Sequence, residues 1–396
     1  MVGGRALMQF SQRLTGKQGT NTLGAELALA RRTGRRIINL ADSNPGSCGL
    51  CVPGALEALG HPDASRYVPD PQGLPGAREA LAERFGGTSG DFFLSASTSE
   101  AYSWLFKLLC NPGDTVLVPK PGYPLFDYLA GLEAVNAEPY YLEYHHPGPW
   151  RIDLDRLREK ALTTKPKALV LIHPNNPTGS FIAQDEREAI VELCEQTGMA
   201  IIADEVFLPY CLEVDGQPES FRGEDRCLVF ALDGLSKLLG LPQFKLGWMR
   251  LSGPAAVLAE ATERLEIIAD TYLSVGAPVM NALPALLPKA DTFIHELRLR
   301  LKANLISARE ILGSGDSPYR VLRCDGGWTA LVEYPRIQTD EELALGLLRE
   351  VGLYVHPGYF YDTGRDGYLA ISLILEQELF TEGLGKLRAH LDGLLA

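Results

Sequence analysis

The sequence predicts an α/β protein with two parts, a large domain on a mostly parallel β-sheet and a smaller α+β domain after it. Strands buried on both faces read as continuous apolar segments, and three such segments occur: residues 167–172 (KALVLI), 199–204 (MAIIAD) and 227–232 (CLVFAL). A predicted helix at 184–197 separates the first two, as in the crossover connections of parallel sheets. The length of 396 residues also suits two domains.

The expected domain bounds follow from these patterns. Residues 1–40 form an N-terminal arm and helix that pack with the small domain, 41–285 form the large domain, and 286–396 form the small domain. Helical periodicity runs from 253 to about 313, and the remainder alternates strands with helices at 339–350 and at the C-terminus.

Charge and composition exclude several classes of protein. The net charge of −13 argues against nucleic-acid or anionic-membrane partners. No signal-peptide core and no run of about 18 apolar residues is present, so we expect a soluble, cytoplasmic protein without a membrane partner. Cys48 and Cys51 form a CxxC, but no second ligand pair at zinc spacing accompanies it. The HExxH, GxSxG and Walker motifs are absent.

A hydroxyl-rich junction at residues 91–110 (DFFLSASTSEAYSWLFKLLC) predicts a strand followed by a helix. The free N–H groups and the dipole of a helix N-terminus bind anions. Thr98 and Ser99 are therefore candidate phosphate contacts. A helix cap without a ligand is the ordinary alternative.

Three later strands end in polar residues. The segment 115–126 ends in Pro-Gly-Tyr123, 167–179 ends in Asn-Asn176-Pro-Thr-Gly, and 199–210 carries Asp204. Ligands bind at the carboxyl ends of strands in open α/β sheets. These side chains are therefore expected at one site.

The segment 233–248 (DGLSKLLGLPQFKLGW) places Lys237 after a small-residue turn at the end of a buried strand. Partial burial lowers the pKa of an amine and makes it a nucleophile toward aldehydes, which is the chemistry of a Schiff-base lysine. Lys245 follows as a second cation that could meet a phosphate. The alternative is a surface loop with two solvated lysines.

Lysine, turn and second cation, preceded by NNPTG and ADEV, resemble the class I/II aminotransferases, which hold pyridoxal 5'-phosphate (PLP). The resemblance covers most of the chain. It implies the PLP-dependent transferase fold (fold type I) and a homodimer. It also implies site roles: Lys237 holds PLP and acts as general base, Asp204 pairs with the pyridine nitrogen, Tyr123 stacks on the ring and Asn176 donates to the phenolate oxygen. For the phosphate it implies Thr98, Ser99, Ser236, Lys245 and, from the partner subunit, Tyr67.

The chain departs from the family pattern at several positions. Ala370 stands where an arginine usually binds the substrate α-carboxylate, Phe207 where a tyrosine donates to the phenolate, and Ser43 where a glycine is usual. Gly234 and Lys245 replace a serine and an arginine of the phosphate site. Arg250, Arg264 or a residue of the partner subunit are the candidates to replace the arginine.

The expected reaction is amino-group transfer between a small amino donor and a keto or aldehyde acceptor. Two alternatives stay open from the sequence. A lyase, decarboxylase or cyclase of the same fold would share every cofactor residue named above. A PLP-sensing regulatory module is disfavoured because no DNA-binding region is appended.

Overall fold

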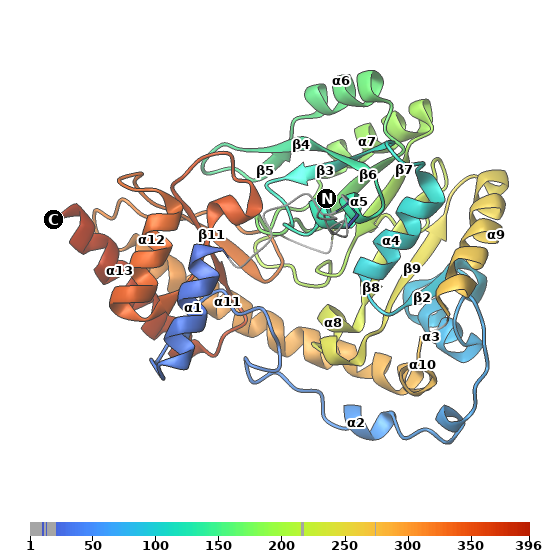
Figure 1. Ribbon diagram of the computed structural model, residues 1–396, viewed down its shortest axis with the longest axis horizontal. Helices are drawn as coiled ribbons and strands as arrows, with labels where there is room; N and C mark the ends of the chain where they lie inside the picture. The colour runs from blue at the N-terminus through green and yellow to red at the C-terminus, as the bar shows by residue number, and fades with distance from the viewer. Residues whose placement is uncertain (1–9, 12, 14–20, 215–217, 274) are drawn as a thin grey trace, which may run out of the picture.

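An eight-stranded β-sheet forms the centre of the larger part of the molecule (Figure 1). The computed structural model describes residues 10–11, 13, 21–214, 218–273 and 275–396, so most of the predicted N-terminal arm lies outside the described residues. The strands lie in the order β2 (Phe92–Ser95), β9 (Gly247–Ser252), β8 (Val229–Gly234), β7 (Ala200–Asp204), β6 (Ala168–Ile172), β3 (Thr115–Lys120), β4 (Asn136–Tyr144) and β5 (Trp150–Ile152). Those from β8 to β4 are parallel, and β9, β2 and β5 are antiparallel to their neighbours.

Helices cover both faces of this sheet, because successive side chains of its central strands point to opposite sides. In β6, Ala168, Val170 and Ile172 pack with one core that includes residues of α4 and α9, whereas Leu169 and Leu171 pack with a second core that includes α6 and α7. The helices of the first face are α4 (Thr98–Leu109), α5 (Phe126–Leu132) and α9 (Ala255–Tyr272), and those of the second are α6 (Leu154–Thr164) and α7 (Gln184–Thr197). The predicted α/β class and the helix at 184–197 are confirmed.

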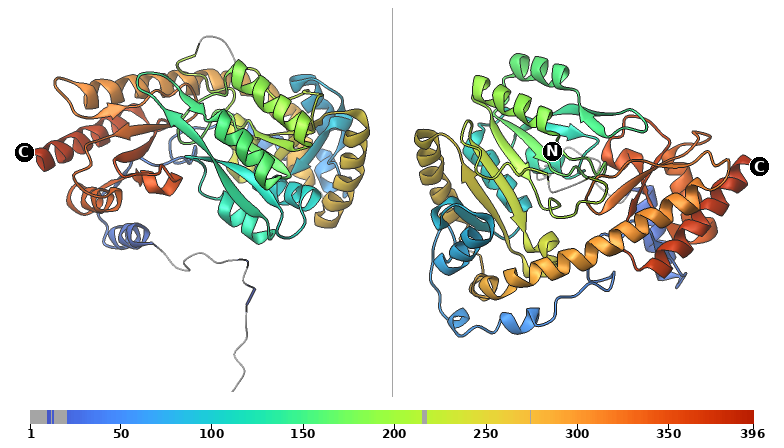
Figure 2. Two further views of the ribbon diagram at one scale, coloured as in Figure 1. Left: turned by 90° about the horizontal axis from the view of Figure 1, so that it is seen from above. Right: turned by 180° about the vertical axis from the view of Figure 1, so that it is seen from behind.

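A four-stranded antiparallel sheet forms the centre of the smaller part. Its order is β10 (Arg320–Val321), β11 (Thr329–Glu333), β14 (Tyr368–Ser372) and β13 (His356–Pro357), and the helices beside it are α12 (Asp340–Gly346) and α13 (Gln377–Leu395). The 24-residue helix α11 (Ala290–Gly313) reaches from the large part to the small one and packs against α13 (Figure 2). Its buried face therefore belongs to a core shared by the two parts.

The N-terminal segment crosses from the small part to the large one (Figure 1). Helix α1 (Thr22–Arg32) packs against α12, and β1 (Ile38–Asn39) pairs in parallel with β12 (Leu353–Tyr354). The chain then passes outside α10 (Ala277–Leu286) through α2 (Ala55–Ala58) to α3 (Pro75–Phe85). The domain bounds at 40 and 285 stay a prediction.

Short helical turns join these elements. They are α8 (Leu235–Leu238), the 3₁₀ turns Pro62–Ser65, Ser89–Asp91, Pro242–Phe244, Leu287–Lys289 and Gly358–Tyr361, and a π-helical turn at Leu347–Val351. Among the described residues, no helix combines the length and the apolar character that a bilayer crossing requires.

Candidate active site

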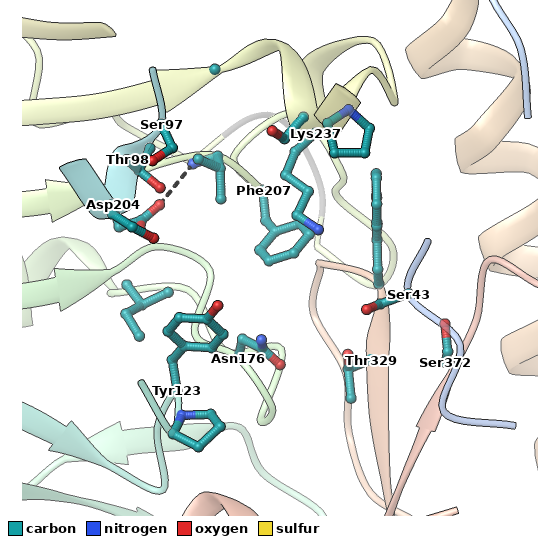
Figure 3. A pocket seen from close by; sticks show the side chains of 18 of the residues that line it. Ser43, Ser97, Thr98, Tyr123, Asn176, Asp204, Phe207, Lys237, Thr329 and Ser372 are labelled. Carbon is teal, nitrogen blue, oxygen red and sulfur yellow. Dashed lines mark hydrogen bonds between the residues drawn. The ribbon is translucent and has the colours of Figure 1, made fainter. Parts of the chain in front are cut away.

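A cavity of about 420 Å³ lies at the carboxyl ends of the central strands, against the small sheet. It is lined by Thr98, Ser99, Tyr123, Asn176, Asp204, Ser236, Lys237 and Lys245. The structure thus brings together eight of the nine residues that the sequence suggested for the site. Figure 3 shows Lys237, Asp204, Tyr123 and Asn176 converging on one space, with Ser43, Thr329 and Ser372 on its far side.

Lys237 stands in α8, directly after β8. Its Nζ lies 4.6 Å from the ring centroid of Trp328 and 5.3 Å from that of Phe207. Burial lowers the pKa of this amine to about 8, and the attraction of Asp204 opposes the shift only in part. The Tyr210 hydroxyl donates to the Lys237 carbonyl at 2.6 Å, which fixes the backbone of the turn. The lysine is therefore a positioned amine whose neutral fraction near neutral pH is far larger than that of a solvated lysine.

Asp204 ends β7 and points into the cavity, whereas Glu205 points away from it. The hydroxyl of Tyr102 donates to Asp204 Oδ2 at 3.2 Å, and the Val206 N–H donates to Oδ1 at 3.3 Å. Burial raises the pKa of Asp204 to about 6, against the lowering effect of these donors and of Lys237. Glu205 is occupied by the Ser220 hydroxyl and the Phe221 N–H, both at 2.6 Å. Only Asp204 is therefore available to a ligand.

Thr98 and Ser99 form the first turn of α4, which Ser97 caps by accepting from the Glu100 N–H at 3.1 Å. Strand β9 approaches this turn closely: a Cβ on Gly247 would lie 3.1 Å from the Thr98 nitrogen. A Cβ on Gly234 would lie 3.1 Å from the Gly247 Cα. Close backbone packing thus favours glycine at position 234.

The exposed Lys245 lines the same end of the cavity as the α4 turn. The free N–H groups of α4 and this ammonium group are the kind of donors that could hold an anion. Ser236 lines the cavity beside Lys237 and belongs to α8.

Asn176 follows β6 in a turn that its neighbour Asn175 braces. The side-chain oxygen of Asn175 accepts from the Thr178 hydroxyl at 3.0 Å, and the backbone carbonyl of Asn175 accepts from the Gly179 N–H at 2.8 Å. Oδ1 of Asn176 is buried without a partner among the described residues. A buried acceptor without a partner indicates a place for a ligand donor, and only the Nδ2 group of the same amide could donate to a ligand oxygen.

Tyr123 and Tyr67 differ in their placement. Tyr123 lines the cavity, and the Phe126 ring meets it edge-on at 6.0 Å between centroids. Tyr67 lies in the segment before α3, is 76% exposed and does not line the cavity. The expected contact of Tyr67 with the cofactor phosphate of the partner subunit stays a prediction.

At the far end of the cavity the buried Ala370 is accompanied by His356, Thr329 and Ser372. No arginine is among the described residues that line the cavity. The two arginines considered as replacements lie elsewhere: Arg250 pairs with Asp91 at 3.7 Å and Arg264 with Glu260 at 2.5 Å. Within this chain, neither of them replaces the missing guanidinium.

The sequence did not single out Tyr102, His356 or Trp328. Tyr102 stands four residues after Thr98, one helical turn along α4, and this spacing was the available signal for it. His356 lies in a short strand and Trp328 in a loop. Only the tertiary fold brings these two residues to the cavity, so the sequence alone gave no signal for them.

The donor set of the cavity fits PLP. It offers an amine for the aldehyde, a buried carboxylate for the ring nitrogen, an amide side chain and the free N–H groups of a helix N-terminus for the phosphate. The described part of the chain holds no group of His, Cys, Asp or Glu side chains suited to a metal.

The chain matches the model of the family "Aminotransferase class I and II" over residues 36–387. It belongs to this family. Like other class I and II aminotransferases, it uses PLP and transfers an amino group from a donor to a keto acceptor. A glutamate-pyruvate aminotransferase of Haemophilus influenzae is 28% identical over 91% of each chain. An alanine aminotransferase of Mycobacterium tuberculosis is 28% identical over 82% of this chain and 78% of its own.

Solved structures confirm the predicted fold type I. An aminotransferase from Escherichia coli has a TM-score of 0.87 at 25% identity and covers 98% of this chain and 99% of its own. An alanine aminotransferase from Pyrococcus furiosus has a TM-score of 0.86 at 23% identity, with coverages of 97% and 100%.

Proposed function

We propose that this aminotransferase takes an amino donor whose recognition does not depend on a carboxylate–arginine pair at position 370. The observation that carries the proposal is the charge of the cavity. Its cationic side chains among the described residues are Lys237 and Lys245, and both stand at the cofactor end. No cation remains beside Ala370 for a carboxylate.

In this proposal, each residue at the cofactor end of the cavity has a role in catalysis or in holding PLP. The Lys237 amine would hold the cofactor aldehyde and, as a free amine, would take and return a proton at the substrate carbon. The Asp204 carboxylate keeps a proton on the ring nitrogen, and Tyr102 holds that carboxylate in place. When bound, PLP supplies an electron sink for the carbanion at the substrate carbon.

Ring and phosphate contacts complete the site. Tyr123 packs on the ring, and the Asn176 amide bonds its phenolate oxygen. The first turn of α4, through Thr98 and Ser99, binds the phosphate together with Ser236 and Lys245. Phe207 offers no hydroxyl, so Asn176 is the phenolate donor that remains.

We also propose a homodimer in which Tyr67 reaches the partner's phosphate site. Support comes from apolar side chains exposed along the segment before α3, with Leu56 71%, Tyr67 76% and Val68 52% exposed. Surfaces of this kind mark protein interfaces. Sedimentation of the purified protein as a monomer at micromolar concentration would exclude this assembly.

An amino-donor screen tests the function. Each donor is mixed with the PLP enzyme, and conversion of the cofactor to its amine form is followed by absorbance. We expect donors without an α-carboxylate to react at least about tenfold faster than alanine, aspartate and glutamate, since one charge-assisted pair contributes about 2 kcal/mol or more. Equal or faster reaction of the three amino acids overturns the proposal.

A further inference from the structure

His356 borders the space that a long side chain at position 370 would occupy. Strands β13 and β14 are antiparallel and place His356 directly opposite Ala370. Residues opposite each other in such a pair carry their side chains on the same face, with Cβ atoms about 5 Å apart. Both residues line the cavity. An imidazole thus stands beside the position where the family resemblance leads us to expect a guanidinium.

The ring of His356 is held in one orientation. Nδ1 lies 3.0 Å from the Tyr361 hydroxyl, and the rings of Tyr354 and Phe360 lie 5.6 and 5.4 Å away between centroids. Among the described residues, Nε2 has no hydrogen-bond partner. The second nitrogen is therefore available to a ligand in the cavity.

This imidazole is uncharged at neutral pH. Burial lowers the pKa of His356 to about 4. A neutral imidazole with Nδ1 engaged offers one hydrogen bond at Nε2, as donor or acceptor according to the tautomer. It therefore offers a ligand a hydrogen bond and not a fixed charge such as a guanidinium carries.

Ser372 provides a second uncharged group at this end. It stands two residues after Ala370 on β14, so the two side chains share a face of the sheet. Its side chain is 4% exposed, and Oγ has no partner among the described residues. A buried hydroxyl without a partner costs free energy unless a ligand satisfies it.

We propose that His356 and Ser372 bind an uncharged hydrogen-bonding group of the amino donor, a carboxamide or a hydroxyl, at the place where relatives bind a carboxylate. This rests on the proposed function. A carboxylate placed there would lose its hydration without gaining a cation. A carboxamide or hydroxyl would satisfy Nε2 and Oγ without that penalty.

Three donors of matched size test this: L-alanine, L-alaninamide and L-alaninol. The half-reaction is measured for the wild type, His356→Phe and His356→Gln. His146→Phe is the matched control, because Nδ1 of the exposed His146 lies 3.1 Å from the Tyr144 hydroxyl, outside the cavity. Thermal melting of each variant checks the fold.

We expect the wild type to prefer alaninamide or alaninol. His356→Phe should lower kcat/KM for that donor about tenfold, mainly through KM, with a smaller loss for alanine. His356→Gln should restore part of the loss, and His146→Phe should equal the wild type. If the neutral donors are preferred but His356→Phe leaves the preference intact, this inference fails while the proposed function stands. Preference of the wild type for alanine overturns the proposed function itself.

Discussion

At the residue scale, Lys237 shows how position creates reactivity. A solvated lysine is almost fully protonated at neutral pH. The aromatic rings of Trp328 and Phe207 cover Lys237 Nζ, and burial lowers the pKa to about 8. Because Asp204 attracts the ammonium form, the pKa does not fall further. The neutral fraction at pH 7.5 is thus substantial.

The rate of PLP attachment should report this pKa. The neutral amine is the nucleophile, so the rate of apoenzyme reconstitution should rise tenfold per pH unit below about 8 and level off above it. The measurement is the absorbance of the cofactor adduct after mixing. A rise that continues to about pH 10, as for a solvated lysine, would contradict the assigned environment.

Substitutions identify the lysine. Borohydride reduction followed by peptide mapping should find the adduct on Lys237, and Lys237→Ala should abolish it. Lys245→Ala is the control: it should weaken PLP binding while the adduct on Lys237 persists. An adduct on another lysine would contradict the assignment of Lys237 as the lysine that binds PLP.

At the element scale, the turn after β6 depends on Gly179. This residue has a φ of +70°, and a Cβ on it would lie 2.6 Å from Cys324 Sγ and 2.7 Å from the Gly326 carbonyl oxygen. The Gly326 N–H also donates to the Gly179 carbonyl at 2.8 Å. The turn that presents Asn176 is therefore braced by the loop before β11.

Gly179→Ala should lower the free energy of unfolding by about 1 to 3 kcal/mol, through backbone strain and steric overlap. It should also weaken PLP binding, because Asn176 shifts with the turn. Denaturant titration and PLP titration measure the two effects. Gly198→Ala is the matched control: its φ is +71°, but a Cβ there meets nothing within 4 Å. Equal losses in both variants would show that strain alone matters.

The sequence was informative about elements that follow simple periodicity. The apolar runs of β6, β7 and β8 and the residues directly after them predicted the cofactor end, because the carboxyl ends of parallel strands meet at one edge of a sheet. The sequence did not predict that His356, Trp328 and Tyr102 line the cavity. Their approach to the cavity depends on cross-strand pairing and on helix rotation, which a single sequence does not reveal.

At the scale of the whole molecule, the cavity joins two sets of elements with different chemistry. The carboxyl ends of the large sheet supply the amine, the carboxylate and the anion site. The small sheet supplies Ala370, His356, Thr329 and Ser372, which are all uncharged at neutral pH. We therefore expect the cofactor end to keep the family's chemistry and the small sheet to change the donor that is accepted.

Restoring the guanidinium tests this account most directly. Ala370→Arg is compared with the wild type and with Ala370→Met, which adds length without charge, in the half-reaction with alanine, aspartate and glutamate. We predict that Ala370→Arg raises kcat/KM for these donors by about 30-fold or more, the equivalent of about 2 kcal/mol, and that Ala370→Met does not. If the wild type already uses them with ordinary efficiency, or if Ala370→Arg gains nothing while remaining folded, another group binds the carboxylate and the account is contradicted.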